Sequence, residues 1–326
     1  MFRKLLVPLD RSPLAEQAIG QAAAIARASQ AELDLVLVHQ PLPFAGFGDA
    51  PWNASQLKDE ERYLDTIAAE LSSGASIPVT HAVLRGNPVE SICQRAHDVK
   101  ADVVVMTSHG RSGFSRAWLG SVADGVIRRA AIPVLMLRAE DGKKTVLTSS
   151  APFKRILVPL DGSALSLNIL PSAIALARGA QARLILLRVV QPVPLVTPDD
   201  SVPFVYPFLV QDDEATNRLV EEARHQLAEE ARKIGTDDNV VVETHTVVAA
   251  HVAQAIMDFA KRQDADAIAM STHGRGASRL LMGSVADKVL RASGLPMLLH
   301  RPAAVRAEPA FLTHEVVEDQ LPALAH

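Results

Sequence analysis

The residues best suited to chemistry in this sequence are glycines and a serine that could hold a phosphate group. Gly110 is followed, after nine residues, by Gly120 and Ser121, and a helix is expected to begin at Val122. Glycine allows close approach of backbone N–H groups to a ligand, and a helix N-terminus adds unpaired donors and a positive dipole. The alternative is a plain strand-to-helix turn in which Ser121 caps the helix.

The same arrangement recurs in the second half of the chain. There, eight residues separate Gly274 from Gly283, and Ser284 and Val285 follow. Because a duplication would also preserve a purely structural turn, the recurrence is compatible with both interpretations.

Two aspartates could contact the other end of such a ligand. Asp10 and Asp161 each end an apolar run that reads VPLD. A carboxylate at this place can accept hydrogen bonds from ribose hydroxyls or from an adenine amino group. The alternative is that each aspartate only shapes the turn or caps the helix that follows.

The residues of an enzyme active site are not apparent. The sequence has no P-loop signature, no G-x-G-x-x-G fingerprint and no G-x-S-x-G nucleophile elbow. His109 and His273 precede the loop glycines without a second ligand at metal spacing, so we interpret them as loop hydrogen-bonding residues. The single cysteine, Cys93, excludes an intramolecular disulfide and an all-cysteine metal cage. We therefore expect no catalytic residues and no metal site.

The chain is a tandem duplication. FRKLLVPLD at 2–10 matches FKRILVPLD at 153–161, and the stretches around the two glycine loops match as well. We assign domain 1 to residues 1–139, a linker to 140–152, domain 2 to 153–301 and a C-terminal tail to 302–326.

Within each domain, short apolar runs alternate with helical stretches, which is typical of parallel βαβ units. The strands expected in domain 1 are 4–9, 33–39, 78–84, 102–107 and 133–137, and those of domain 2 are 156–160, 182–187, 240–247, 265–270 and 296–299. The predicted fold class is α/β, with two doubly wound, five-stranded parallel sheets. Ligands of such sheets bind outside the carboxyl ends of the strands, where the aspartates and glycine loops should lie.

The composition narrows the range of partners. The 326 residues include 33 basic and 37 acidic side chains, which give a net charge of -4. No basic tract suggests nucleic-acid binding, and no apolar run of 18 residues or more suggests a membrane span. The N-terminus lacks an apolar signal region, so a cytoplasmic location is expected.

Both halves resemble the universal stress protein family, over residues 2–138 and 153–300. Nucleotide-binding members carry G-2x-G-9x-G-[ST] after the fourth strand and an aspartate at the end of the first. Thr107 and Ser271 stand in place of the first glycine of that motif, and the second loop is one residue short. The resemblance implies a stress-response protein that binds ATP, with or without Mg²⁺.

The resemblance also implies a role for each matching residue of domain 1. Asp10 would hold the adenosine, Gln40 would lie near the adenine, and Met106 and Thr107 would line the base of the site. The phosphates would be held by Gly110, Gly120, Ser121 and Val122. The set assigned to domain 2 is Asp161, Val189, Met270, Ser271, Gly274, Gly283, Ser284 and Val285.

Family domains pair through their last strands, which here are the apolar runs 133–137 and 296–299. A tandem chain can form this pair internally, and a homodimer of the whole chain is a further possibility. The segments 41–47 and 191–209 follow the second strands and are interpreted as flaps at the ligand edge or as plain surface loops.

We therefore compare three functions. The first is a sensor that binds ATP, with domain 1 as the better site because it alone keeps the nine-residue spacing. The second is a slow ATPase, against which stands the lack of a repeated base that could activate water. The third is a scaffold that binds no nucleotide, which Thr107, Ser271 and the shortened second loop favour.

Overall fold

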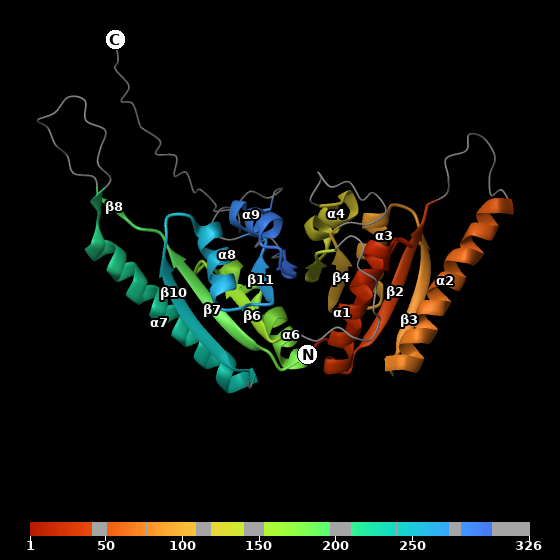
Figure 1. Ribbon diagram of the computed structural model, residues 1–326, viewed down its shortest axis with the longest axis horizontal. Helices are drawn as coiled ribbons and strands as arrows, with labels where there is room; N and C mark the ends of the chain where they lie inside the picture. The colour runs from red at the N-terminus through yellow and green to blue at the C-terminus, as the bar shows by residue number, and fades with distance from the viewer. Residues whose placement is uncertain are drawn as a thin grey trace, which may run out of the picture.

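The computed structural model describes residues 1–40, 51–75, 77–108, 119–139, 153–195, 210–238, 240–273 and 282–301 (Figure 1). The predicted linker at 140–152 and tail at 302–326 lie outside these ranges. Domain 1 comprises β1 (Lys4–Leu9), α1 (Pro13–Ser29), β2 (Glu32–His39), α2 (Pro51–Ala75), β3 (Val79–Arg85), α3 (Pro88–Asp98), β4 (Val103–Thr107), α4 (Ser121–Arg129) and β5 (Val134–Leu137).

Domain 2 repeats this order with additions. It comprises β6 (Arg155–Pro159), α5 (Ala164–Leu167), α6 (Leu170–Ala180), β7 (Arg183–Val190), β8 (Pro194–Leu195), β9 (Val210–Gln211), α7 (Asp213–Asp238), β10 (Val242–Val248), α8 (Val252–Arg262), β11 (Ala267–Ser271), α9 (Ser284–Ala292) and β12 (Met297–His300). The antiparallel pair β8–β9 joins the ends of the predicted flap of domain 2. Most of that flap and all of 41–47 lie outside the described residues.

Local sequence signals explain how the first helix begins. Ser12 has extended backbone dihedrals and its Oγ accepts a hydrogen bond from the backbone N of Ala15 at 3.1 Å, while Pro13 occupies the first turn. A serine cap followed by proline is a strong start signal because proline lacks the N–H that would otherwise be unpaired there. α1 therefore starts directly after the carboxyl end of β1.

The ten main strands form one continuous sheet. Its order is β10-β7-β6-β11-β12-β5-β4-β1-β2-β3, with parallel pairing inside each domain and antiparallel pairing between β5 and β12. The predicted doubly wound sheets are thus confirmed, and the predicted pairing of the last strands occurs within the chain. Figure 1 shows the consequence: β3 with α2 lies at one end of the molecule, and β10 with α7 lies at the other.

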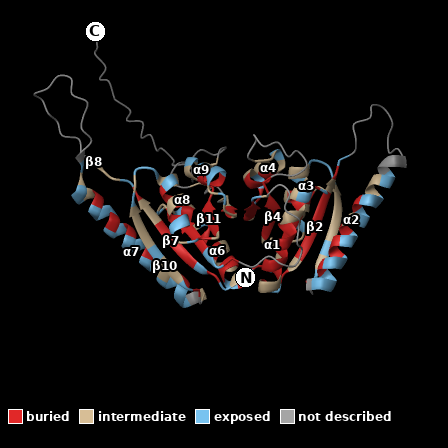
Figure 2. Ribbon diagram, viewed as in Figure 1, coloured by how far each residue is buried: buried red, intermediate tan, exposed pale blue. Residues whose placement is uncertain are grey.

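Two apolar layers cover the faces of this sheet and run through both domains. One contains buried residues of α1, α2, α6 and α7, and the other contains those of α3, α4, α8 and α9. Figure 2 shows the buried residues on the strands and on the helix faces that pack against them. The domains also meet where α1 contacts α6, because Gly179 leaves room for Ser29 that a Cβ would take. No helix of the described ranges is long and apolar enough to cross a membrane.

Candidate functional site

Each domain has a cavity at the carboxyl edge of its parallel strands. In domain 1 the cavity measures about 240 Å³ and contains every predicted site residue that the structure describes: Asp10, Gln40, Met106, Thr107, Gly120, Ser121 and Val122. In domain 2 it measures about 890 Å³ and contains Asp161, Val189, Met270, Ser271, Gly283, Ser284 and Val285. Gly110 and Gly274, together with His109, lie outside the described residues. The sequence thus selected residues that the fold brings together.

The strand register changes one of the assigned equivalences. Pro8 pairs with Val36 in domain 1, and Pro159 pairs with Leu187 in domain 2, so the two second strands align with an offset of 151. With this offset the counterpart of Gln40 is Gln191, and Val189 corresponds to Val38. The assignment of Val189 as the equivalent of Gln40 was therefore wrong by two residues. Val189 and Gln191 both line the cavity.

The two aspartates shape the turn after the first strand. Asp10 Oδ1 accepts a hydrogen bond from the backbone N of Ser12 at 3.0 Å. Asp161 Oδ1 accepts from the N of Ser163 at 2.9 Å and from its Oγ at 2.6 Å. Each aspartate therefore orients the serine that caps the next helix and does not cap the helix itself. Because both are half-buried and line the cavities, this structural role and contact with a ligand are compatible.

The helices that follow the two glycine loops are not capped by serine, as the sequence had suggested for Ser121. The residue that caps α4 is Gly120, Ser121 is the first helical residue, and the described chain provides no side-chain cap hydrogen bond. The same holds for Gly283 and Ser284 at α9. The capping role proposed for Ser121 is therefore wrong. The first-turn N–H groups of both helices lie at the cavity wall without a capping side chain, which is the arrangement that binds anions.

A backbone hydrogen bond holds the glycine before each helix, and at Gly283 a tight contact explains why the residue is glycine. The N of Gly120 donates to the carbonyl of Ser108 at 2.7 Å, and the N of Gly283 donates to that of Thr272 at 2.6 Å. A Cβ on Gly283 would lie 2.9 Å from the carbonyl oxygen of Thr272, so any larger residue must displace backbone. The glycine thereby fixes the helix N-terminus against the end of the neighbouring strand.

The hydroxyl residues in place of the first motif glycine are buried. Thr107 is 5% exposed and Ser271 is 7% exposed. Ser271 Oγ lies 3.3 Å from the carbonyl oxygen of Ser166 and donates a hydrogen bond to it. This hydroxyl therefore ties β11 to α5, and it lies at the base of the cavity beside Met270.

His273 contributes a polar atom that lacks a protein partner. Its Nδ1 lies 3.0 Å from Thr272 Oγ1, in keeping with its predicted role as a loop hydrogen-bonding residue. Its Nε2 is buried and has no hydrogen-bond partner in the part of the chain that the structure describes. His273 is also one of the residues that line the cavity of domain 2. The described residues contain no cluster of three or more His, Cys, Asp or Glu that could hold a metal ion.

Polar contacts that the sequence did not reveal hold α2 against the other elements of domain 1. His39 Nδ1 and Glu60 Oε2 lie 2.8 Å apart, with side chains only 4% and 1% exposed. The Tyr63 hydroxyl donates to Glu16 at 2.8 Å. Burial and this hydrogen bond raise the pKa of Tyr63 above its ordinary value, so the hydroxyl stays a donor. Both contacts fasten α2 to the rest of the domain.

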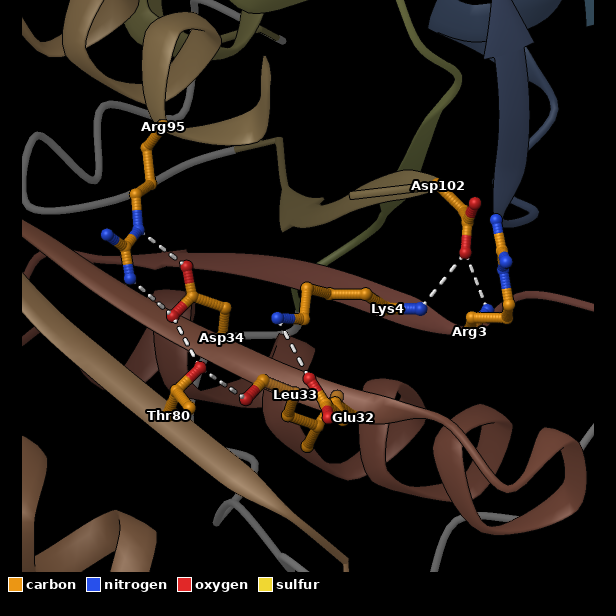
Figure 3. Close-up of polar contacts among 8 residues, drawn as sticks. All are labelled: Arg3, Lys4, Glu32, Leu33, Asp34, Thr80, Arg95 and Asp102. Atoms are coloured by element: carbon orange, nitrogen blue, oxygen red, sulfur yellow. Dashed lines mark hydrogen bonds and ion pairs between the residues drawn. The ribbon is translucent and has the colours of Figure 1, made fainter. Parts of the chain in front are cut away.

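A buried ion pair supports the same region from the other face of the sheet. Arg95 of α3 donates from Nε to Asp34 Oδ2 at 2.8 Å and from Nη2 to Oδ1 at 3.0 Å. Thr80 of β3 adds a hydrogen bond to Asp34 at 2.8 Å, as Figure 3 shows. The Asp34 side chain is completely buried, and two residues further along β2 Val36 lines the cavity. The pair therefore fixes α3, which supplies Ile92 to the cavity wall.

Comparison with known proteins agrees with this architecture. The model of the universal stress protein family matches residues 1–138 and 152–301. The chain belongs to the universal stress protein family. A universal stress protein of Methanocaldococcus jannaschii is 30% identical over 141 residues, which are 42% of this chain and 83% of the relative.

Other universal stress proteins match across both domains. One from Mycobacterium tuberculosis strain H37Rv is 26% identical over 274 residues, which are 80% of this chain and 82% of the relative. The crystal structure of a universal stress protein from Archaeoglobus fulgidus superimposes with a TM-score of 0.64 at 20% identity and covers 92% of this chain and 98% of its own. The tandem universal stress protein architecture is therefore shared with these relatives.

Proposed function

We propose that each domain binds an adenine nucleotide, principally ATP, and that the protein acts in stress responses as a nucleotide-dependent regulator. One observation carries this proposal: the carboxyl ends of β1 and β4 and the uncapped N-terminus of α4 meet at one cavity in domain 1, and the equivalent elements meet in domain 2. An acceptor at one side and backbone donors at the other suit a nucleoside joined to phosphates.

The chemistry of the donors fits this ligand. The N–H groups of the first turn of α4, with Ser121 beside them, would donate hydrogen bonds to phosphate oxygens. Asp10 would accept a hydrogen bond from the nucleoside. Bound ATP would supply negative charge that these donors neutralise, and Mg²⁺ would share that charge.

The direct test of this function is the mass of the nucleotide released from protein purified without added ligand, followed by calorimetry with ATP and AMP. Detection of an adenine nucleotide and its displacement by ATP supports the proposal. Full-length protein that releases none and binds none would favour the scaffold without nucleotide.

Loop spacing and cavity size bear differently on which domain binds ATP better. Domain 1 keeps nine residues between its loop glycines, whereas domain 2 keeps eight. The cavity of domain 1 is the smaller one, at about 240 Å³ against about 890 Å³ in domain 2. We therefore keep domain 1 as the better site for ATP, and we assign the larger cavity of domain 2 a different preference below.

We also propose that the protein is not an efficient ATPase. Hydrolysis requires a positioned water and groups that stabilise the transition state more than the bound substrate. The described residues that line the domain 1 cavity include one carboxylate, Asp10, and no histidine, lysine or arginine. We expect turnover with Mg²⁺ below about 1 s⁻¹, the lower end of typical enzyme rates. A faster rate that disappears in Ser121→Asp would establish an enzyme instead.

Two substitutions can separate the role of Asp10 in ligand binding from its structural role in the turn. Asp10→Asn removes the charge but keeps a side-chain oxygen that can accept the hydrogen bond from Ser12 N. Asp10→Ala removes both the charge and this hydrogen bond of the turn. We expect both variants to weaken ATP and AMP binding by a similar factor of about 10–100, since a charged acceptor is lost. Only Asp10→Ala should also melt at a clearly lower temperature. If Asp10→Asn bound both nucleotides as the wild type does, Asp10 would serve the turn alone.

A further inference from the structure

An arginine enters the ligand cavity of domain 2 from a strand that is apolar at this place in domain 1. Arg188 is half-buried, lines the cavity and lies 3.5 Å from the carbonyl oxygen of Leu160, to which Nη1 donates. Its guanidinium lies over Gly162, where a Cβ would be 2.9 Å from Cζ. Gly162 therefore makes room for the guanidinium beside the turn that holds Asp161.

Domain 1 has the opposite pair of residues at these places. The register of the second strands makes Leu37 the counterpart of Arg188, and Arg11 the counterpart of Gly162. Leu37 is 1% exposed within the apolar layer, while Arg11 is exposed, with its guanidinium 6.0 Å from the centre of the Tyr63 ring. The described lining of the domain 1 cavity contains no basic residue. Among the residues that the structure describes, only domain 2 thus directs an arginine into its cavity.

The space beside Arg188 is also larger in domain 2. Where domain 1 has the buried pair His39 and Glu60, domain 2 has Val190 and Ala223, which pack together in a small apolar cluster. Gln226 replaces Tyr63, and the cavity extends along α7 past Ala223 to Leu219, which is 42% exposed. The cavity of domain 2 is therefore lined both by Arg188 and by this part of α7.

The domain 2 cavity is therefore lined by two groups whose charge favours anions, together with the carboxylates of Asp161 and Glu222. One is the N-terminus of α9, which is shared in kind with domain 1, and the other is Arg188 at the opposite, Asp161 side. Arginine binds phosphate through parallel N–H donors, so its guanidinium is well matched to a phosphate group. A ligand that satisfies both sites carries phosphate groups at both ends of a nucleoside.

We propose that domain 2 prefers an adenine nucleotide that carries a second phosphate on its ribose, and that Arg188 binds this phosphate. This proposal rests on the proposed nucleotide function, in which Asp161 lies next to the nucleoside and Ser284 next to the 5′-phosphate. Arg188 is then the residue that sets the ligand preference of domain 2 apart from that of domain 1.

The test uses the full chain with Ser121→Asp to block phosphate binding in domain 1. Calorimetry compares 5′-AMP with adenosine 3′,5′-bisphosphate and adenosine 2′,5′-bisphosphate. We expect one bisphosphate to bind about 10–100 times more tightly than AMP, because a charge-assisted contact is added. Arg188→Leu, which introduces the residue of domain 1, should abolish the preference and keep AMP binding, and Arg188→Lys should keep part of it.

Equal affinities for AMP and both bisphosphates would overturn the assignment of Arg188 while leaving nucleotide binding in place. A preference that persists in Arg188→Leu would overturn it as well, since another group would then hold the second phosphate. If none of the three ligands bound, the proposed nucleotide function would fall together with this inference. Circular dichroism of Arg188→Leu, expected to match the parent protein, excludes misfolding as the cause of a lost preference.

Discussion

Replacing Arg95 with leucine should lower the free energy of unfolding by about 3 kcal/mol, the lower end of the range for breaking a buried ion pair. The completely buried Asp34 carboxylate would keep Thr80 as a donor but lose both hydrogen bonds from the guanidinium. The lower end applies because the Arg95 side chain is 27% exposed. Urea denaturation of the full chain, compared with wild type, measures the change.

Two double variants show how much of this loss comes from the unpaired Asp34 charge and how much from lost packing. Asp34→Asn with Arg95→Leu removes the unpaired charge and should recover part of the loss. Asp34→Ile with Arg95→Phe copies the corresponding residues of domain 2, Ile185 and Phe259, both of which are buried there. Since apolar residues often replace a buried ion pair without loss, this variant should be close to wild type. If Asp34→Asn brought no recovery, packing would account for the effect.

The strands and the site edge were predictable because their signals are local. A parallel strand covered on both faces needs a continuous apolar run, as in β1, where Leu5, Leu6 and Val7 are completely buried. The ends of the predicted strands agree with the observed ones to within two residues, the usual uncertainty of element ends, except that β7 extends to Val190, three residues beyond its predicted end. Residues that follow these runs, such as Asp10 and Gly120, must lie on one edge of a parallel sheet. Their convergence on one cavity follows from topology.

The features that distinguish the two domains were not predictable in the same way. His39 and Glu60 lie 21 residues apart on different elements, and only the packing of α2 against β2 brings them together. Asp34 and Arg188 did leave a signal, since each is a charged residue within an apolar strand. Their partners are set by tertiary structure, so the signal identified an exception without its role. The shift of Val189 against Gln191 shows the same limit, because register is fixed by strand pairing.

A negative charge at the start of α4 should abolish ATP binding by domain 1. Ser121 is exposed and is the first residue of the helix, where an aspartate interacts favourably with the helix dipole. Ser121→Asp should therefore fold at least as stably as wild type. A unit charge 4 Å from another costs about 4 kcal/mol near a protein surface, which corresponds to roughly a thousandfold loss of affinity.

The measurement is calorimetry with ATP in EDTA, so that no metal ion bridges the new carboxylate and the phosphates. Ser121→Asn adds nearly the same volume without charge and should lose far less affinity. Ser284→Asp applies the same change to α9, so the variant that removes the tighter binding event identifies the better ATP site. We expect this to be Ser121→Asp, and the opposite result would transfer that role to domain 2. Unchanged ATP binding in both aspartate variants would place the phosphates away from the helix N-termini, because no phosphate held by these N–H groups could tolerate the added charge.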